Sequence, residues 1–300
     1  MNLQVLAAEP GLTRGTATSR ALDYTLMAVM AASFSSAAIF VLLSGAPGPV
    51  AATWRLIFST AIVAAIAFGR GTLGLLRRLS RRDYLVAAAG GLFLALHFDT
   101  WMASLHYVSV AVSVTIVDSY PALLVIVGTL AFNERYRASE VAGAVLAMIG
   151  VALLSTSDPL RRFFVGVLLS LSGMVFMVLY LSVGKLMRER LDTFSYVTAV
   201  YAPAAAFSAA ISAALGYSLT GYDAVSWLSF LALALVPMIG GHTMMNYLIG
   251  RRDLISSTVA MMAEPVGSAA LAYLIFGQRV TALQGLYMAI TLIGIGVAAS

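Results

Sequence analysis

The sequence contains no cysteine among its 300 residues and few charged side chains. The absence of cysteine excludes disulfide bonds, iron–sulfur clusters and thiol catalysis. Charged residues make up only 10% of the chain while hydrophobic residues make up 61%, and the mean hydropathy is +0.93. Soluble globular domains do not have this composition. It predicts an integral membrane protein.

The sequence also lacks the motifs of the common enzyme classes. It has no HExxH, no GxSxG and no glycine-rich phosphate loop, and it leaves no cytosolic stretch large enough to hold a nucleotide. A hydrolase or metal site would have to use His97, Asp99 and His242 alone. We therefore predict that the protein is not an enzyme and that it has no cofactor and no metal site.

One long stretch of the chain occurs twice. Residues 119–154 resemble residues 263–299, and a shift of 144 positions without a gap superposes Pro121 on Pro265 and Arg135 on Arg279. Each copy has an apolar segment containing proline, a short polar turn and a second apolar segment rich in glycine and alanine. An apolar run of about 20 residues spans the roughly 30 Å core of a bilayer. Each copy is therefore predicted to be a transmembrane hairpin.

The hydrophobic runs predict an all-α protein with ten transmembrane helices. They fall at 22–43, 50–69, 84–105, 109–132, 138–155, 163–184, 194–215, 224–249, 253–276 and 281–299. We expect an N-terminal lead (1–21), a first five-helix repeat (22–155), a turn-rich linker (156–162) and a second five-helix repeat (163–300). Because five is odd, the second repeat enters the membrane from the opposite side, as in many secondary transporters with inverted repeats.

The basic residues predict the orientation. With both termini in the cytoplasm, fourteen arginines and lysines lie in the cytoplasmic loops and tail, and four lie on the other side: Arg55, Arg161, Arg162 and Arg279. Basic residues favour the cytoplasmic side of a membrane protein. This asymmetry also explains the excess of basic residues. We therefore expect membrane lipid and no nucleic acid as a partner.

The repeats resemble a known family. A proline-containing helix, a turn with the residues Asn-Glu-Arg or Gly-Gln-Arg, and a glycine-rich helix end each half, and Trp54-Arg55-Leu56 stands early in the second span. This layout resembles the drug/metabolite transporter superfamily, in its EamA-like ten-helix branch, over residues 22–299. Two features depart from the superfamily: Gln278 stands where a glutamate is frequent, and the first span lacks the acidic residue of the small multidrug transporters.

Within that branch, the third span with its histidine and tryptophan is most similar to bacterial exporters of aromatic and other neutral amino acids. The resemblance implies export of Phe, Tyr, Trp, Met or Thr across the bacterial inner membrane by alternating access. Another small metabolite or a drug is the alternative substrate, and facilitated diffusion is the alternative to proton antiport. A channel is a further alternative class, although inverted halves with acids at the membrane midplane favour alternating access.

Two carboxylic acids are predicted near the midplane. Asp118 lies in the fourth span beside Pro121, and Glu264 lies in the ninth span beside Pro265. Charge inside a bilayer is costly, and burial favours the protonated form of a carboxyl group. Both acids are therefore candidates for substrate binding and for coupling to protons, with Glu264 the stronger one. Alternatively, they hydrogen-bond to other helices and only fix the packing.

Two pairs at helical spacing are predicted to contact substrate: His97 with Trp101, and His242 with Asn246. Inversion of the repeats predicts the first pair toward the outer end and the second toward the inner end. The alternative places Trp101 in the interfacial aromatic belt and treats the histidines as packing residues. The remaining substrate-binding candidates are hydroxyl residues: Tyr120, Tyr180 and Ser36.

Two further patterns concern helix faces. One stripe of the ninth span carries Ser257, Met261, Glu264 and Ser268, and we expect it to face a cavity. Small residues four apart occur in the fifth and tenth spans, Gly143 with Ala147 and Gly285 with Ala289. Such pairs allow close helix packing in membranes.

Overall fold

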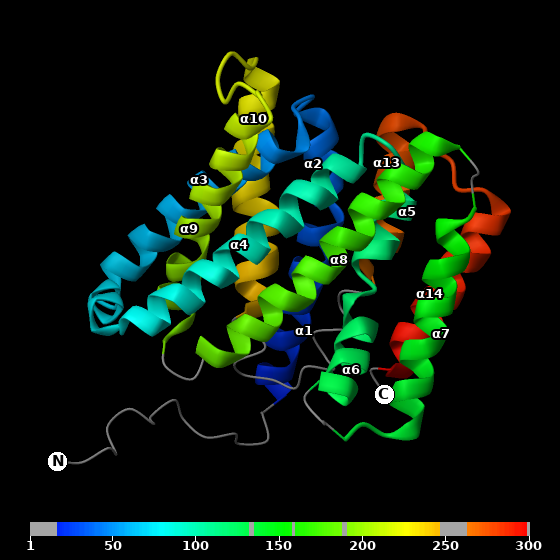
Figure 1. Ribbon diagram of the computed structural model, residues 1–300, viewed down its shortest axis with the longest axis horizontal. Helices are drawn as coiled ribbons and strands as arrows, with labels where there is room; N and C mark the ends of the chain where they lie inside the picture. Colours follow the sequence, from blue (N-terminus) through cyan, green and yellow to red (C-terminus); the bar gives the residue numbers. More distant parts are fainter. Residues whose placement is uncertain (1–16, 132–134, 158–159, 188–190, 247–262, 299–300) are drawn as a thin grey trace.

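The computed structural model describes residues 17–131, 135–157, 160–187, 191–246 and 263–298. These residues form helices joined by short turns (Figure 1). The helices are α1 (Ala17–Ser35), α2 (Ala37–Leu43), α3 (Gly48–Gly69), η1 (Leu73–Arg78), α4 (Arg81–Ser104), α5 (Val110–Val117), α6 (Tyr120–Ala131), α7 (Ala138–Ser155), α8 (Arg161–Met187), α9 (Thr193–Ala214), α10 (Ala224–Leu233), η2 (Ala234–Thr243), α13 (Ala263–Phe276) and α14 (Ala282–Ala298).

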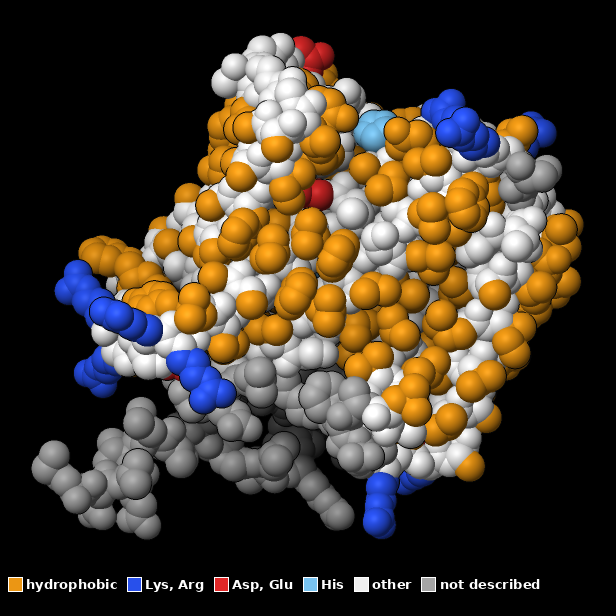
Figure 2. All heavy atoms as spheres, viewed as in Figure 1, with side chains coloured by type: hydrophobic (Ala, Val, Ile, Leu, Met, Phe, Trp, Pro, Cys, Tyr) orange, Lys and Arg blue, Asp and Glu red, His pale blue; other side chains and the backbone are white. Residues whose placement is uncertain are grey.

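The helices have the lengths and composition of a multi-pass membrane protein. Among the described residues, eight helical stretches are long and apolar enough to cross a membrane, and α13 and α14 are shorter apolar helices. The first part of the expected span 253–276 lies outside the described residues. Apolar side chains cover much of the face seen in Figure 2, and basic side chains gather at its edges. The predicted all-α membrane fold is confirmed.

Polar residues in the turns determine where several helices begin. Ser80 and Asp83 form a reciprocal capping box at the start of α4. Asp192 accepts hydrogen bonds from two backbone N–H groups at the start of α9, and Asp223 accepts one from Ser226 at the start of α10. Such side chains satisfy backbone donors that have no partner within the helix. The hydrophobic spans are thereby delimited by short polar turns.

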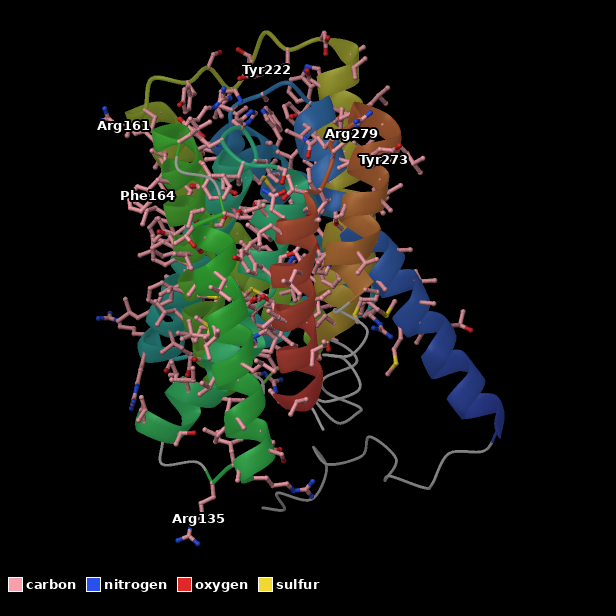
Figure 3. All side chains as sticks on the ribbon, turned by 90° about the vertical axis from the view of Figure 1, so that its right-hand side faces the viewer. Arg135, Arg161, Phe164, Tyr222, Tyr273 and Arg279 are labelled. Carbon is pink, nitrogen blue, oxygen red and sulfur yellow. The ribbon has the colours of Figure 1, made fainter. Side chains whose placement is uncertain are left out.

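The two repeats run in opposite directions. Arg135 and Arg279 occupy equivalent positions in the repeats, and Figure 3 shows them at opposite ends of the molecule. Repeat-related helices also pack against each other, α3 with α9 and α7 with α14, and the packing of α4 on α8 is mirrored by that of η2 on α1. This pattern is expected for a pseudo-twofold axis in the membrane plane.

Glycine permits the contact between α7 and α14. A Cβ atom at Gly143 would collide with the backbone of Ala298, and one at Gly294 would collide with the backbone of Ala147. The expected close packing at Gly143 is therefore present. The expectation for Gly285 is wrong, because no atom outside its own surroundings lies within 4 Å of a Cβ built there. The spacing of small residues alone does not tell which face of α14 meets its partner.

Three expected spans are not continuous α-helices. The first is interrupted at Ser36, the fourth at Asp118 and Ser119, and the eighth changes from an α-helix to a π-helix at Ala234. Pro121 follows the second break and Pro237 lies inside the π-helix. Proline has no backbone N–H to continue a helix, and π-helical turns widen the backbone. These irregular segments surround the centre of the molecule.

The placement of Arg55 corrects the count of basic residues. Arg55 was counted with the basic residues of the outer side, at the start of the second span, but it lies two turns inside α3 and its side chain is fully buried. The helix begins after Pro47, and a Cβ atom at Gly48 would collide with the backbone of Ala103. Three of the four basic residues that the predicted orientation counted on the outer side then remain: Arg161, Arg162 and Arg279.

Candidate functional site

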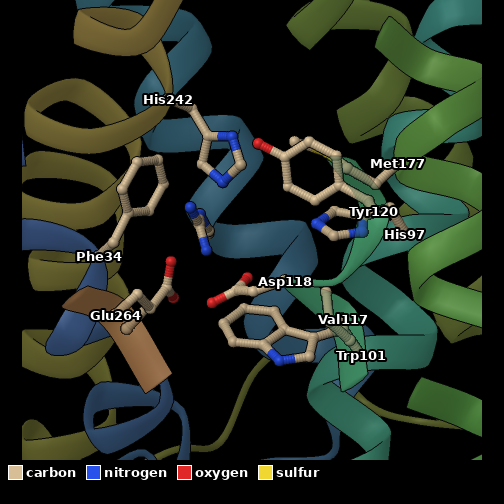
Figure 4. A pocket seen from close by; sticks show the side chains of 11 residues that line it. Phe34, His97, Trp101, Val117, Asp118, Tyr120, Met177, His242 and Glu264 are labelled. Carbon is tan, nitrogen blue, oxygen red and sulfur yellow. The ribbon is translucent and has the colours of Figure 1, made fainter. Parts of the chain in front are cut away.

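A small cavity lies between the two halves of the protein (Figure 4). Its free volume of about 20 Å³ corresponds to about one water molecule. Helices of both repeats supply its walls. The lining residues are Phe34, Ala37, Arg55, His97, Trp101, Val117, Asp118, Tyr120, Met177, His242 and Glu264.

The two expected midplane acids meet in this cavity. Asp118 follows α5 as its C-terminal cap, Glu264 lies in the first turn of α13, and their carboxyl groups are within hydrogen-bonding reach. Figure 4 shows the two groups pointing toward each other. Asp118 Oδ2 has no hydrogen-bond partner among the described residues. A hydrogen bond between two carboxyl groups requires a proton on one of them.

Arg55 is the residue of this site that the sequence reasoning missed. Its guanidinium carbon lies 4.1 Å from the centroid of the Phe98 ring, a cation–π contact. Nε, Nη1 and Nη2 are buried and have no hydrogen-bond partner among the described residues. Its charge interacts with that of Glu264. A signal was present, since Arg55 interrupts an apolar run just as Asp118 does, and ionisable residues inside spans suggest function.

The histidine and aromatic side chains form one cluster. The ring centroids of His97 and His242 are 6.3 Å apart, and His97 lies parallel to Trp101 at the same distance. Phe34 meets His242 edge-on at 4.9 Å. The expectation that the two pairs lie near opposite ends of the protein is therefore wrong. Inversion moves repeat-related positions far apart only when they lie away from the pseudo-twofold axis. His97 and His242 lie close to that axis, so they stay together.

Trp101 belongs to the cavity and not to an interfacial belt. Only 5% of its surface is exposed, and its indole Nε1 has no hydrogen-bond partner among the described residues. Gly173 of α8 allows this arrangement, since a Cβ there would lie 3.2 Å from the Trp101 Cβ. The Gly173 carbonyl also lies 2.9 Å from His97 Nδ1. A carbonyl only accepts, so Nδ1 carries the hydrogen.

A second glycine positions the opposite wall. The π-helix η2 contains Gly241, and a Cβ there would lie 2.8 Å from the Phe34 ring. The missing side chain lets α1 approach η2 until Phe34 contacts His242. π-Helical turns are frequent at functional sites. The irregular backbone of η2 thus places an imidazole in the cavity.

The other predicted residues are divided between the cavity and its surroundings. Tyr120 lines the cavity. Tyr180 and Asn246 lie outside the lining, with the Asn246 amide 3.4 Å from the Tyr180 hydroxyl. Ser36 donates to the Ser33 carbonyl, and Ser268 donates to the Ser35 carbonyl. Ser257 and Met261 lie outside the described residues.

Asp99 does not line the cavity. Its Oδ1 accepts a 2.6 Å hydrogen bond from the Ser208 hydroxyl of α9. Among the residues described, no group of three His, Cys, Asp or Glu side chains is arranged to hold a metal ion. The cavity instead brings together a guanidinium, a carboxyl pair and aromatic rings, which are groups that bind small polar molecules.

Comparison with known proteins agrees with this architecture. Residues 23–156 and 164–300 each match the model of the EamA-like transporter family. A crystal structure of a protein with 23% sequence identity superposes with a TM-score of 0.69, covering 92% of this chain and 97% of the other, which shows a shared fold. No curated protein matches the chain. With two family matches that together span nearly all its length, the chain belongs to the EamA-like transporter family of the drug/metabolite transporter superfamily, whose members are membrane secondary transporters of small molecules.

Proposed function

We propose that this transporter exports neutral amino acids, foremost those with large apolar side chains, across the bacterial inner membrane by alternating access. The observation that carries the proposal is the central cavity. Phe34, Trp101 and Met177 give it apolar walls, and charged groups stand beside them. A site for Phe or Met needs an apolar surface for the side chain and a few polar groups for the backbone atoms. The candidate substrates are Phe, Tyr, Trp, Met and Thr.

The size of the cavity supports a moving site. Room for about one water is far too little for an amino acid, so substrate entry requires the surrounding helices to separate. The interruptions at Ser36 and Asp118 and the π-helix η2 border the cavity and provide places where the helices bend. Inverted halves provide two equivalent openings, one toward each side of the membrane.

The carboxyl pair supports coupling to protons. Two buried carboxyl groups that face each other can share a proton, and an arriving ammonium group favours its release. Competition between proton and substrate is what an antiporter requires. We assign the coupling role to Glu264 first, because its helix starts beside the cavity and its charge also interacts with Arg55.

Counterflow in proteoliposomes tests the proposed function. Vesicles loaded with unlabelled phenylalanine should accumulate labelled phenylalanine transiently. Vesicles loaded with tyrosine, tryptophan or methionine instead should do the same. A channel gives no such trans-stimulation. Nucleosides and cationic dyes serve as comparison substrates. If these drive counterflow while none of the amino acids does, the proposed substrate class is wrong.

The proposed orientation has both termini in the cytoplasm, and the absence of native cysteine makes it easy to test. Arg135 and Arg279 are exposed and stand at opposite ends of the molecule. With an impermeant thiol reagent applied to intact cells, Arg279→Cys should be labelled and Arg135→Cys should be labelled only after permeabilisation. The reverse pattern would place the termini outside.

A further inference from the structure

We propose that Arg55 is the anchor for the carboxylate of the substrate, so that a transported molecule must carry a free carboxylate. This inference rests on the proposed function. The proposed function specifies the side chains of the transported amino acids, and the inference adds that the substrate must carry a free α-carboxylate. The carboxyl pair of Asp118 and Glu264 then receives the ammonium group. The aromatic wall receives the side chain.

The first argument is the cost of burying Arg55. Its side chain has no exposed surface, and none of its three nitrogens has a hydrogen-bond partner among the described residues. A buried ion without partners is strongly unfavourable, and buried charges are normally paired and hydrogen-bonded. The cation–π contact with Phe98 compensates only a part of that cost. Arg55 therefore stands ready for an anion that enters the cavity.

The second argument is geometric. A guanidinium presents its N–H groups in a planar fork that matches the two oxygens of a carboxylate. The Phe98 ring packs against the guanidinium carbon and leaves the donors at the edge of the fork unoccupied. Both Arg55 and the carboxyl pair line the same cavity. An α-amino acid carries its carboxylate and ammonium on one carbon, which suits a site with both partners close together.

The third argument is the balance of charge. Arg55 supplies a positive charge, and Asp118 and Glu264 supply the acidic groups of the same cavity. A zwitterion adds one charge of each sign, and each charge meets its opposite. An amine without a carboxylate adds a positive charge and leaves Arg55 unpaired. A carboxylate without an amine satisfies Arg55 but leaves the ammonium site unused.

Competition by phenylalanine analogues tests the inference in the wild-type protein. The probes are phenylpropionate, which lacks the ammonium group, and phenethylamine and phenylalaninamide, which lack the carboxylate. We expect phenylpropionate to compete with labelled phenylalanine in counterflow. Loss of a charge-assisted bidentate contact should make the amine and the amide about ten to a hundred times weaker than phenylalanine. Equal competition by the amide and phenylalanine would overturn the inference.

Variants of Arg55 supply the second arm, with Arg70 as the matched control. Arg70 follows α3 and also packs on an aromatic ring, with its guanidinium 5.0 Å from the centroid of Phe194, but it lies outside the cavity. Arg55→Gln should remove the preference for phenylalanine over its amide, Arg55→Lys should retain part of it, and Arg70→Gln should keep it unchanged. An Arg55→Gln protein that still prefers phenylalanine contradicts the inference.

Failure of the inference differs from failure of the proposed function. If amino acids are transported but their amides are transported equally well, only the role of Arg55 is wrong. If no amino acid is transported while simple aromatic carboxylates bind, as measured by thermal shift of the purified protein, the proposed substrate is wrong and the role of Arg55 stands. If Arg55→Gln does not fold, the analogue series on the wild-type protein decides alone. A wild-type protein that binds neither amino acids nor carboxylates overturns both.

Discussion

Tyr120 and Glu264 occupy equivalent positions in the two repeats, and their side chains line the same cavity. The pseudo-twofold axis therefore passes close to the cavity, but the two halves contribute different chemistry. One half supplies a phenol and the other a carboxyl group at the same position. A site at the axis has the same position relative to both repeats. Its chemistry is nevertheless asymmetric, because only the second repeat contributes a carboxyl group at this position.

Glu264→Gln should abolish the dependence of transport on the pH gradient and retain exchange between substrates. The amide keeps the size and hydrogen-bonding capacity of the side chain but cannot release a proton. The measurement is uptake of labelled phenylalanine into proteoliposomes with and without an imposed pH gradient, beside counterflow at equal pH. Tyr120→Phe is the matched control at the equivalent position and should keep the gradient dependence.

Two outcomes of that experiment contradict the assignment. If the wild type responds to the gradient and Glu264→Gln responds identically, Glu264 does not couple, and Asp118→Asn is the next variant to measure. If the wild type shows no response, the protein is a facilitator.

Trp101→Ala should weaken the transport of large apolar amino acids selectively. Removal of the indole takes away a wall of the cavity, and the lost apolar contact should raise the apparent Km for phenylalanine roughly tenfold. Threonine should be affected less, because it fills less of that wall. Trp227→Ala is the control, since Trp227 packs on Trp54 with ring centroids 4.6 Å apart and lies outside the cavity lining. An equal loss for every substrate would indicate a structural or gating role.

Gly143→Leu should destabilise the protein by disrupting the contact between α7 and α14. A side chain at Gly143 collides with the backbone of Ala298, which a change of rotamer cannot relieve. Overpacking of this kind costs about 1–3 kcal/mol. Gly285→Leu is the matched control on α14, because its position is open. Thermal unfolding in detergent measures both, and equal unfolding temperatures for the two variants would contradict the packing described above.

His106 should make stability depend on pH independently of transport. It lies in the turn between two membrane spans, where burial lowers the pKa of its imidazole, a hydrogen bond to the Ala46 backbone opposes this, and Arg162 adds to the lowering. The unfolded chain then takes up the proton at a higher pH than the folded protein does. The contribution of His106 is complete above its ordinary pKa of 6.5 and is lost as the pH falls toward the lowered value.

Thermal unfolding between about pH 7.5 and about pH 5.5 checks this sign. The wild type should lose stability toward acid, and His106→Gln should lose less over the same range. A steeper loss in the variant would mean that the folded protein favours the charged imidazole.

The sequence predicted the membrane fold and the repeat because each depends on a pattern along the chain. It singled out Asp118 and Glu264 separately but did not predict that they face each other. It counted Arg55 with the outer side, because a cation near the start of an apolar run does not reveal how deep in the helix it lies. It separated His97 from His242, since a linear pattern does not locate the pseudo-twofold axis. It also missed Phe34, whose place in the cavity depends on Gly241 of a different helix. Contacts between distant segments decided each of these cases.

The most direct test of the central cavity as the amino-acid site is the fluorescence of Trp101. The protein has three tryptophans, so replacing Trp54→Phe and Trp227→Phe together leaves Trp101 as the only one. Addition of phenylalanine should change the emission of this protein in a saturable way, with half-saturation close to that of counterflow. The converse variant, Trp101→Phe, should show no change. A response that follows Trp54 and Trp227 and leaves Trp101 silent would contradict the account.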